Sequence, residues 1–71
     1  MVQSFLRRTE VERLTGLPRS TIYEKMKRGE FPKNVRISGR AVGWLETEIA
    51  DWQAARIAQR DNAAVEQGRA A

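Results

Sequence analysis

Hydrogen-bonding and basic side chains are concentrated between residues 19 and 28 of this chain of 71 residues. If the segment is helical, Ile22 and Met26 lie about 40° apart around its axis and mark a buried stripe. Polar groups then occupy the outer face and its flanks, on Arg19, Ser20, Thr21, Tyr23, Glu24, Lys25, Lys27 and Arg28. Such groups suit nucleic-acid recognition, because the major groove of B-DNA admits one α-helix and offers base edges to its side chains. A solvated helix surface carries similar residues, so this pattern alone decides little.

Two kinds of contact are expected from these residues. We predict base-edge contacts from Thr21, Glu24, Lys27 and Arg28, with Ser20 on the same face. We predict backbone contacts from Arg19, Tyr23, Lys25 and Arg40. A helix N-terminus has free N–H groups and partial positive charge, which suit a phosphate, and Arg19 would add to that charge. Two alternatives stay open: Glu24 accepts from a cytosine or only pairs with Arg28, and Tyr23 contacts a phosphate or only packs.

The charge of the chain is distributed unevenly. Residues 1–40 contain ten basic and four acidic residues, a balance of +6. Residues 41–71 contain three basic and five acidic residues, a balance of −2. A basic segment of this kind favours a polyanionic partner, here double-stranded DNA. The same charge on a merely solvated surface would need no partner.

The residue types that are absent exclude several classes of site. The chain has no cysteine and no histidine, which excludes a disulfide framework, a cysteine-type zinc site, a thiol nucleophile and a histidine-dependent triad. A chain of this length forms one small domain without a second lobe to close a substrate cleft. We therefore expect no enzyme, no metal and no cofactor. The N-terminus has no long apolar run, so we expect neither a signal peptide nor a membrane span, and place the protein in the cytoplasm.

A short helix is predicted around residues 9–15. Thr9 and Glu12 have the spacing of a capping box, in which each side chain bonds the backbone N–H of the other residue. Val11 and Leu14 are expected on the inner face of this helix. Gly16 suits the left-handed position that ends it.

The second helix is predicted over Pro18–Arg28. Proline suits the first turn, where its missing N–H costs nothing. Gly29 suits the end of this helix. Phe31 and Pro32 then interrupt the regular secondary structure, and we expect Phe31 to fill the core.

A two-stranded hairpin is predicted after the second helix. Val35–Ile37 alternates apolar and charged residues as a half-buried strand does. Ser38–Arg40 forms the turn, with Arg40 near the tip, and Ala41–Trp44 returns. Trp44 is expected in the core. An apolar pair at residues 5 and 6 either forms a further strand or only packs as an anchor.

The last helix is predicted from Leu45 to about Arg60. Leu45, Ile49 and Trp52 share one face at the spacing of a helix, and we expect Trp52 to be a core residue. Arg56 falls on the same stripe. Either the apolar contact ends near Trp52, or the Arg56 stem packs while its guanidinium reaches solvent.

Together these elements predict a mainly α fold with a small β-hairpin, in the order of a winged helix-turn-helix. We expect the domain to span residues 1–60. Residues 61–71 form a polar, alanine-rich tail that either continues the helix, frays or is disordered.

Residues 14–23 have the sequence LTGLPRSTIY, which is similar to the helix-turn-helix core of the AlpA family of phage and prophage regulators. Residues 29–33 (GEFPK) and 38–44 (SGRAVGW) are similar to its linker and wing, and residues 45–52 to its closing helix. The resemblance covers roughly residues 5–60. It departs at Pro18, where the family often has serine, so the cap of the second helix must come from elsewhere.

The resemblance implies a winged helix-turn-helix related to the MerR-type and excisionase folds. It implies two linked roles, as a transcriptional regulator of prophage and integrase genes and as an excisionase. Integrase, RNA polymerase and further copies of the chain on DNA are the protein partners that these roles imply. The rival hypothesis is a small protein-interaction adaptor without DNA specificity of its own, which predicts little salt dependence of any DNA binding.

Overall fold

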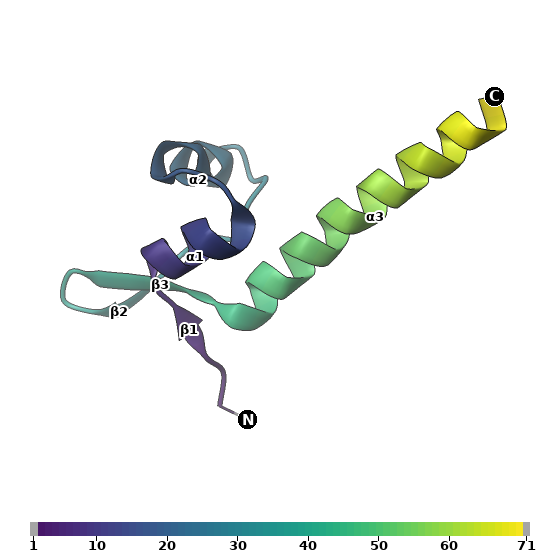
Figure 1. Cartoon of the computed structure of the whole chain (residues 1–71). Coiled ribbons are helices and arrows are strands. Elements are labelled where there is room, and N and C mark those ends of the chain that lie inside the picture. The colour runs from purple at the N-terminus through teal and green to yellow at the C-terminus, as the bar shows by residue number, and fades with distance from the viewer. Residues whose placement is uncertain (1, 71) are drawn as a thin grey trace.

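The computed structural model describes the backbone of residues 2–70 and the side chains of residues 2–63. Its elements follow in the order β1 (Phe5–Leu6), α1 (Arg8–Thr15), α2 (Arg19–Lys27), β2 (Val35–Ser38), β3 (Ala41–Leu45) and α3 (Glu46–Ala70) (Figure 1). The predicted mainly α fold with a small hairpin, in winged helix-turn-helix order, is confirmed.

Strand β3 is the centre of a three-stranded antiparallel sheet in the order β1-β3-β2. Leu6 pairs with Trp44, so residues 5 and 6 form a strand rather than only an anchor. On the other side, Val35 pairs with Gly43. A Cβ atom on Gly43 would lie 2.7 Å from Ile37 Cδ1 and 3.0 Å from the Leu6 carbonyl oxygen. A larger residue at this position would have to displace the end of the Ile37 side chain and would crowd the Leu6 carbonyl, so the packing on β3 favours glycine here.

The hairpin of β2 and β3 forms the wing. Gly39 and Arg40 connect its strands, and Gly39 has a φ of 48°, a conformation that glycine adopts at little cost. The strand pairing shifts between Arg36 and Ser38, as at a β-bulge. Arg40 is exposed at the tip of the wing, as predicted.

Helix α1 begins differently from the prediction. The capping box at Thr9 and Glu12 is wrong, because Arg7 is the N-cap and no side chain provides a cap hydrogen bond. Arg7 directly follows β1 and has an extended backbone, with a ψ of 162°, so the sheet leads straight into the helix. Glu12 instead forms an ion pair with Arg8.

The other predictions for α1 have mixed outcomes. Gly16 ends the helix with a φ of 74°, and its N–H donates to the Glu12 carbonyl oxygen at 2.8 Å, as expected for a left-handed C-terminus. Val11 is completely buried, whereas Leu14 is 39% exposed, contrary to the prediction. Leu14 lies about 60° from Val11 around the helix axis. It therefore borders an open groove between α1 and α3 instead of the core.

Helix α2 is one residue shorter at each end than predicted. Pro18 is its N-cap, with a ψ of 163°, and Arg28 is its C-cap. No side chain provides a cap hydrogen bond at the N-terminus, so neither hydroxyl in the first turn replaces the serine that the family often has at position 18. Gly29 has a φ of 72°, and its N–H donates to the Met26 carbonyl oxygen at 3.2 Å, which ends the helix as predicted.

Helix α3 begins one residue later than predicted and ends further along the chain. Leu45 pairs with Phe5 in the sheet, and the Glu46 N–H donates to the Ser4 carbonyl oxygen at 2.9 Å. The prediction that Leu45 lies on the helical stripe is therefore wrong. The backbone of α3 continues without a break to Ala70 and leads away from the rest of the chain (Figure 1). Residue 71 and the side chains of residues 64–70, in the predicted tail, lie outside the described part.

The core lies where the helices meet the sheet. It consists of Val11, Ile22, Phe31, Trp44 and Ile49. The indole N–H of Trp44 donates to the Pro32 carbonyl oxygen at 3.0 Å, and that of Trp52 donates to the Glu30 carbonyl oxygen at 3.1 Å. Trp52 also packs edge-on against Phe31, with ring centroids 5.0 Å apart. Both tryptophans thus support the domain, as predicted.

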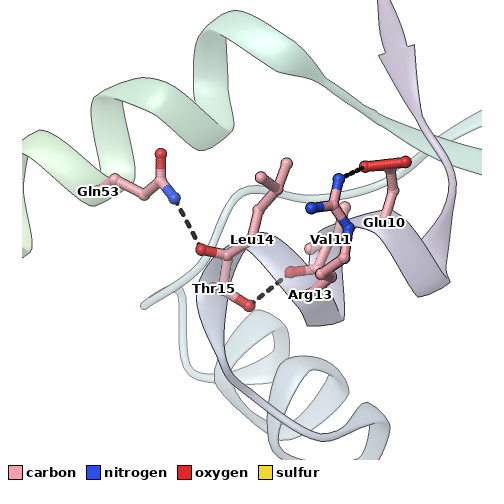
Figure 2. Close-up of polar contacts among 6 residues, drawn as sticks. All are labelled: Glu10, Val11, Arg13, Leu14, Thr15 and Gln53. Carbon is pink, nitrogen blue, oxygen red and sulfur yellow. Dashed lines mark hydrogen bonds and ion pairs between the residues drawn. The ribbon is translucent and has the colours of Figure 1, made fainter.

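Side chains of α3 attach it to the body. Gln53 Nε2 donates to the Leu14 carbonyl oxygen at 2.8 Å and so binds the C-terminal end of α1 (Figure 2). The Arg56 guanidinium lies 5.9 Å from the centroid of the Trp52 ring. Arg56 is exposed, and the part of it that lies against Trp52 is the guanidinium rather than the stem, so the two alternatives considered for Arg56 stay open.

Candidate nucleic-acid interface

Burial of one side of α2 turns its other side outward. Ile22 is completely buried, and Tyr23 packs edge-on against Trp44 with ring centroids 6.3 Å apart. The outer face of α2, as we call it, consists of the exposed residues Ser20, Glu24, Lys27 and Arg28. With Tyr23 they line a shallow hollow of about 380 Å³. The structure thus brings four of the predicted DNA-contacting residues onto one surface.

An ion pair lies within the outer face of α2. Arg28 donates to Glu24 Oε1 at 2.7 Å, and the two side chains are 63% and 61% exposed. The pairing considered for Glu24 is therefore present in the chain without DNA. Since an exposed pair contributes only about 0–1 kcal/mol, either partner can be released to another ligand at small cost.

Two other predicted residues lie off the outer face of α2. Lys25 is 28% exposed in its side chain and lies 3.8 Å from Glu30 Oε1, so it is turned toward the end of the helix. Thr21 is half-buried on the flank. The structure does not bring Lys25 together with the other candidates for backbone contacts.

A second surface, which we call the arginine hollow, lies at the N-terminal end of α2. It encloses about 340 Å³. Its lining comes from α1 and the residue before it, from α2, from the wing tip and from β3: Arg7, Arg8, Thr9, Arg19, Tyr23, Arg40 and Val42. Three predicted backbone contacts, Arg19, Tyr23 and Arg40, meet here. Arg7 and Arg8 line the same hollow, although they were not among the predicted site residues.

A third surface, the lysine hollow, lies toward the C-terminal end of α2. It encloses about 400 Å³ and is lined by Tyr23, Met26, Lys27, Lys33 and Asn34. Tyr23 borders this hollow, the arginine hollow and the outer face of α2. Its ring packs on Trp44, whereas the phosphate contact considered for it stays a prediction.

Ion pairs neutralise only part of the charge of residues 1–40. Each of the four acidic residues in this segment pairs with a basic one, in Glu10–Arg13, Glu12–Arg8, Glu24–Arg28 and Glu30–Lys25. Six basic residues of the segment have no carboxylate at ion-pair distance among the described side chains: Arg7, Arg19, Lys27, Lys33, Arg36 and Arg40. Five of these six border the arginine or lysine hollow, so the excess charge is gathered around α2.

In the described part of the chain, no group of acidic residues is suited to hold a metal ion. None of the helices there combines the length and apolar character that a membrane crossing requires.

Comparisons with known proteins point to one family. The family model described as prophage CP4-57 regulatory protein (AlpA) matches residues 4–57. The chain is 52% identical over 58 residues to the uncharacterized protein ORF88 of Enterobacteria phage P4, a match that covers 82% of this chain and 66% of that protein. It is 39% identical over 57 residues to the DNA-binding transcriptional activator AlpA of Escherichia coli K12, covering 72% of this chain and 81% of that protein. The chain thus spans just under two thirds of the length of its phage P4 relative.

Proposed function

The chain belongs to the AlpA family of prophage regulatory proteins, and from that premise we propose that it is a sequence-specific DNA-binding regulator of phage or mobile-element genes. The observation that carries this proposal is the position of its excess charge. Basic side chains that have no carboxylate at ion-pair distance within the described part of the chain surround the exposed, hydrogen-bonding outer face of α2. A surface of this kind combines phosphate contacts, which fix the position of a protein on DNA, with groups that can contact base edges.

In this proposal the outer face of α2 enters the major groove. Ser20, Lys27 and Arg28 offer donors to base edges, and Arg28 exchanges its pairing with Glu24 for a base or a phosphate. The wing tip lies beside the N-terminal end of α2, because Arg40 and Arg19 line one hollow. Arg40 therefore contacts the backbone or the minor groove that flanks the bound major groove.

The biological role within this class depends on where the protein binds. Regulation of prophage and integrase genes predicts binding sites beside a promoter and an effect on RNA polymerase. An excisionase role predicts repeated sites inside a phage attachment region, with integrase as partner and with further copies of the chain on the same DNA. Footprinting on the DNA of the source element tests the two roles, and finding sites of both kinds supports a dual role.

Binding itself is tested by fluorescence anisotropy with duplex DNA from 50 to 200 mM salt. We expect binding that weakens steeply with salt, because each phosphate that the protein neutralises adds about 0.9 to the slope of log Kobs against log salt concentration. We also expect tighter binding to a footprinted site than to a random duplex of equal length. Absence of binding to any duplex at 50 mM salt contradicts the proposal and favours a protein-interaction adaptor.

A further inference from the structure

We propose that the arginine hollow binds the phosphate backbone of DNA, and that Arg7 and Arg8 therefore belong to the interface. This inference rests on the proposed DNA-binding function and adds a contact site to it. Four arginine residues line one hollow of about 340 Å³, although they come from separate parts of the chain. Arg7 and Arg8 lie where β1 passes into α1, Arg19 begins α2, and Arg40 is at the wing tip.

The hollow gathers positive charge without an internal counter-charge. No acidic residue is among those that line it. Arg7, Arg19 and Arg40 have no carboxylate at ion-pair distance among the described side chains. Bringing like charges together costs free energy, and an anion that bridges them offsets this cost. A phosphodiester suits the site because guanidinium groups donate paired hydrogen bonds to phosphate oxygens.

Two arginines of the hollow are held in place by neighbouring side chains. Arg8 Nε lies 3.1 Å from Glu12 Oε2 in an ion pair, and this buried nitrogen has no hydrogen-bond partner among the described residues. The Arg19 guanidinium lies 5.8 Å from the centroid of the Tyr23 ring. Tyr23 in turn packs on Trp44 in the core. The domain therefore orients part of the hollow before any ligand binds, which lowers the entropic cost of binding.

The start of α2 adds donors beside the hollow. Pro18 caps the helix without a side-chain hydrogen bond, and the Ile22 N–H, which donates to the Pro18 carbonyl oxygen at 3.0 Å, begins the bonded part. The backbone N–H groups of the first turn thus face the N-terminal end of the helix, where its dipole favours an anion. Arg19 lies in that turn and also lines the hollow.

The salt dependence of DNA binding tests the role of the hollow. We compare the full chain with Arg7→Gln, Arg40→Gln and the matched control Arg60→Gln, which removes one charge from α3. Because each lost phosphate contact lowers the salt slope by about 0.9, the wild-type protein should lose roughly three- to fourfold more affinity between 50 and 200 mM salt than either hollow variant. Arg60→Gln should retain the wild-type slope. Thermal unfolding monitored by circular dichroism checks that all variants fold.

Neutral methylphosphonate groups, substituted one phosphate at a time in the bound duplex, test whether the arginines converge. We expect one position, or two adjacent ones, where the substitution weakens binding of the wild-type protein but has little effect on Arg7→Gln and on Arg40→Gln. If the two variants instead lost their sensitivity to methylphosphonate at well-separated phosphates, the arginines would not converge on one phosphate site. A salt slope for Arg7→Gln equal to that of Arg60→Gln would show that Arg7 does not belong to the interface. Failure of the wild-type protein to bind DNA would overturn the proposed function itself.

Discussion

The outer face of α2 and the arginine hollow lie side by side, with Tyr23 on the border of both, yet their charges are arranged in opposite ways. On the outer face of α2, Arg28 is paired with Glu24, and a hydroxyl and an amine lie beside the pair. In the hollow, three of the four arginines have no carboxylate at ion-pair distance among the described side chains.

Under the proposed function, this difference assigns specificity to one surface and general affinity for DNA to the other. A face with mixed donors, acceptors and a replaceable ion pair suits discrimination between bases, because a wrong base leaves polar groups unsatisfied. A concentration of unpaired guanidinium groups suits any duplex, because every phosphate has the same charge.

Replacement of Trp44 by alanine should abolish both surfaces together. Trp44 is completely buried, supports the Tyr23 ring and donates to the Pro32 carbonyl oxygen. Truncation of a buried tryptophan typically lowers the free energy of unfolding by about 3–5 kcal/mol, which is most of the stability of a domain of this size. Urea denaturation followed by circular dichroism measures the loss. An unchanged midpoint would show that the core is not organised around this residue.

Arg28→Ala should affect specificity more than general affinity. We expect a loss of about 1–3 kcal/mol on the footprinted site and a relaxed preference at one base pair, since Arg28 lies on the outer face of α2. Anisotropy titrations on the footprinted site and on random DNA measure the two affinities. Equal losses on both duplexes would assign Arg28 to the backbone and would remove the distinction between the two surfaces.

Glu24→Gln tests what the ion pair on the outer face of α2 does. We expect binding to random DNA to strengthen by about 0.5–1 kcal/mol, because the substitution removes a negative charge near the phosphates and releases Arg28. Glu48→Gln, which removes one negative charge from exposed α3, is the matched control. A loss confined to one cytosine-containing position of the footprinted site would instead show that Glu24 accepts from that base.

Glu12→Gln should have the smallest effect. It removes the partner of Arg8 across one helical turn, at an expected cost of about 0.5 kcal/mol or less in the free energy of unfolding. The ratio of affinities for footprinted and random DNA should stay unchanged, because Arg8 lies in the hollow and not on the outer face of α2. A changed ratio would mean that the hollow also takes part in base discrimination.

The outer face of α2 could be predicted because its signals are local. Ile22 and Met26 mark the inner side by their spacing, and Gly16 and Gly29 take the positive φ values expected at the helix ends. Each of these signals depends on residues within one or two turns of helix. Local geometry does not determine which way a long side chain such as that of Lys25 turns, and it turns toward Glu30.

The boundaries that were predicted wrongly depend on contacts between distant residues. The pairing of Leu6 with Trp44 keeps the chain extended up to Arg7, so the hydroxyl of Thr9 cannot act as the cap of α1. The pairing of Phe5 with Leu45 extends β3 and delays α3 by one residue. A sheet that joins residues about forty positions apart overrides local helix signals at both places.

The arginine hollow was missed for the same reason. Arg7 and Arg8 were counted as basic residues, but only the third strand brings the start of α1 beside the wing. A signal was nevertheless present in the sequence. The basic pair directly follows an apolar pair that was considered as a strand, and pairing that strand with residues 44 and 45 would have carried Arg7 toward Arg40.

The length of α3 makes the orientation of the domain measurable from a distance. From Ile49 in the core to the exposed Ala63 the helix extends about 21 Å, so a rotation of the domain by about 10° displaces Ala63 by about 4 Å. The chain has no native cysteine. A cysteine introduced at Ala63 would therefore carry the only fluorophore or spin label. Because of the length of α3, a small rotation of the domain on the double helix would appear as a measurable change in the distance from this label to the DNA.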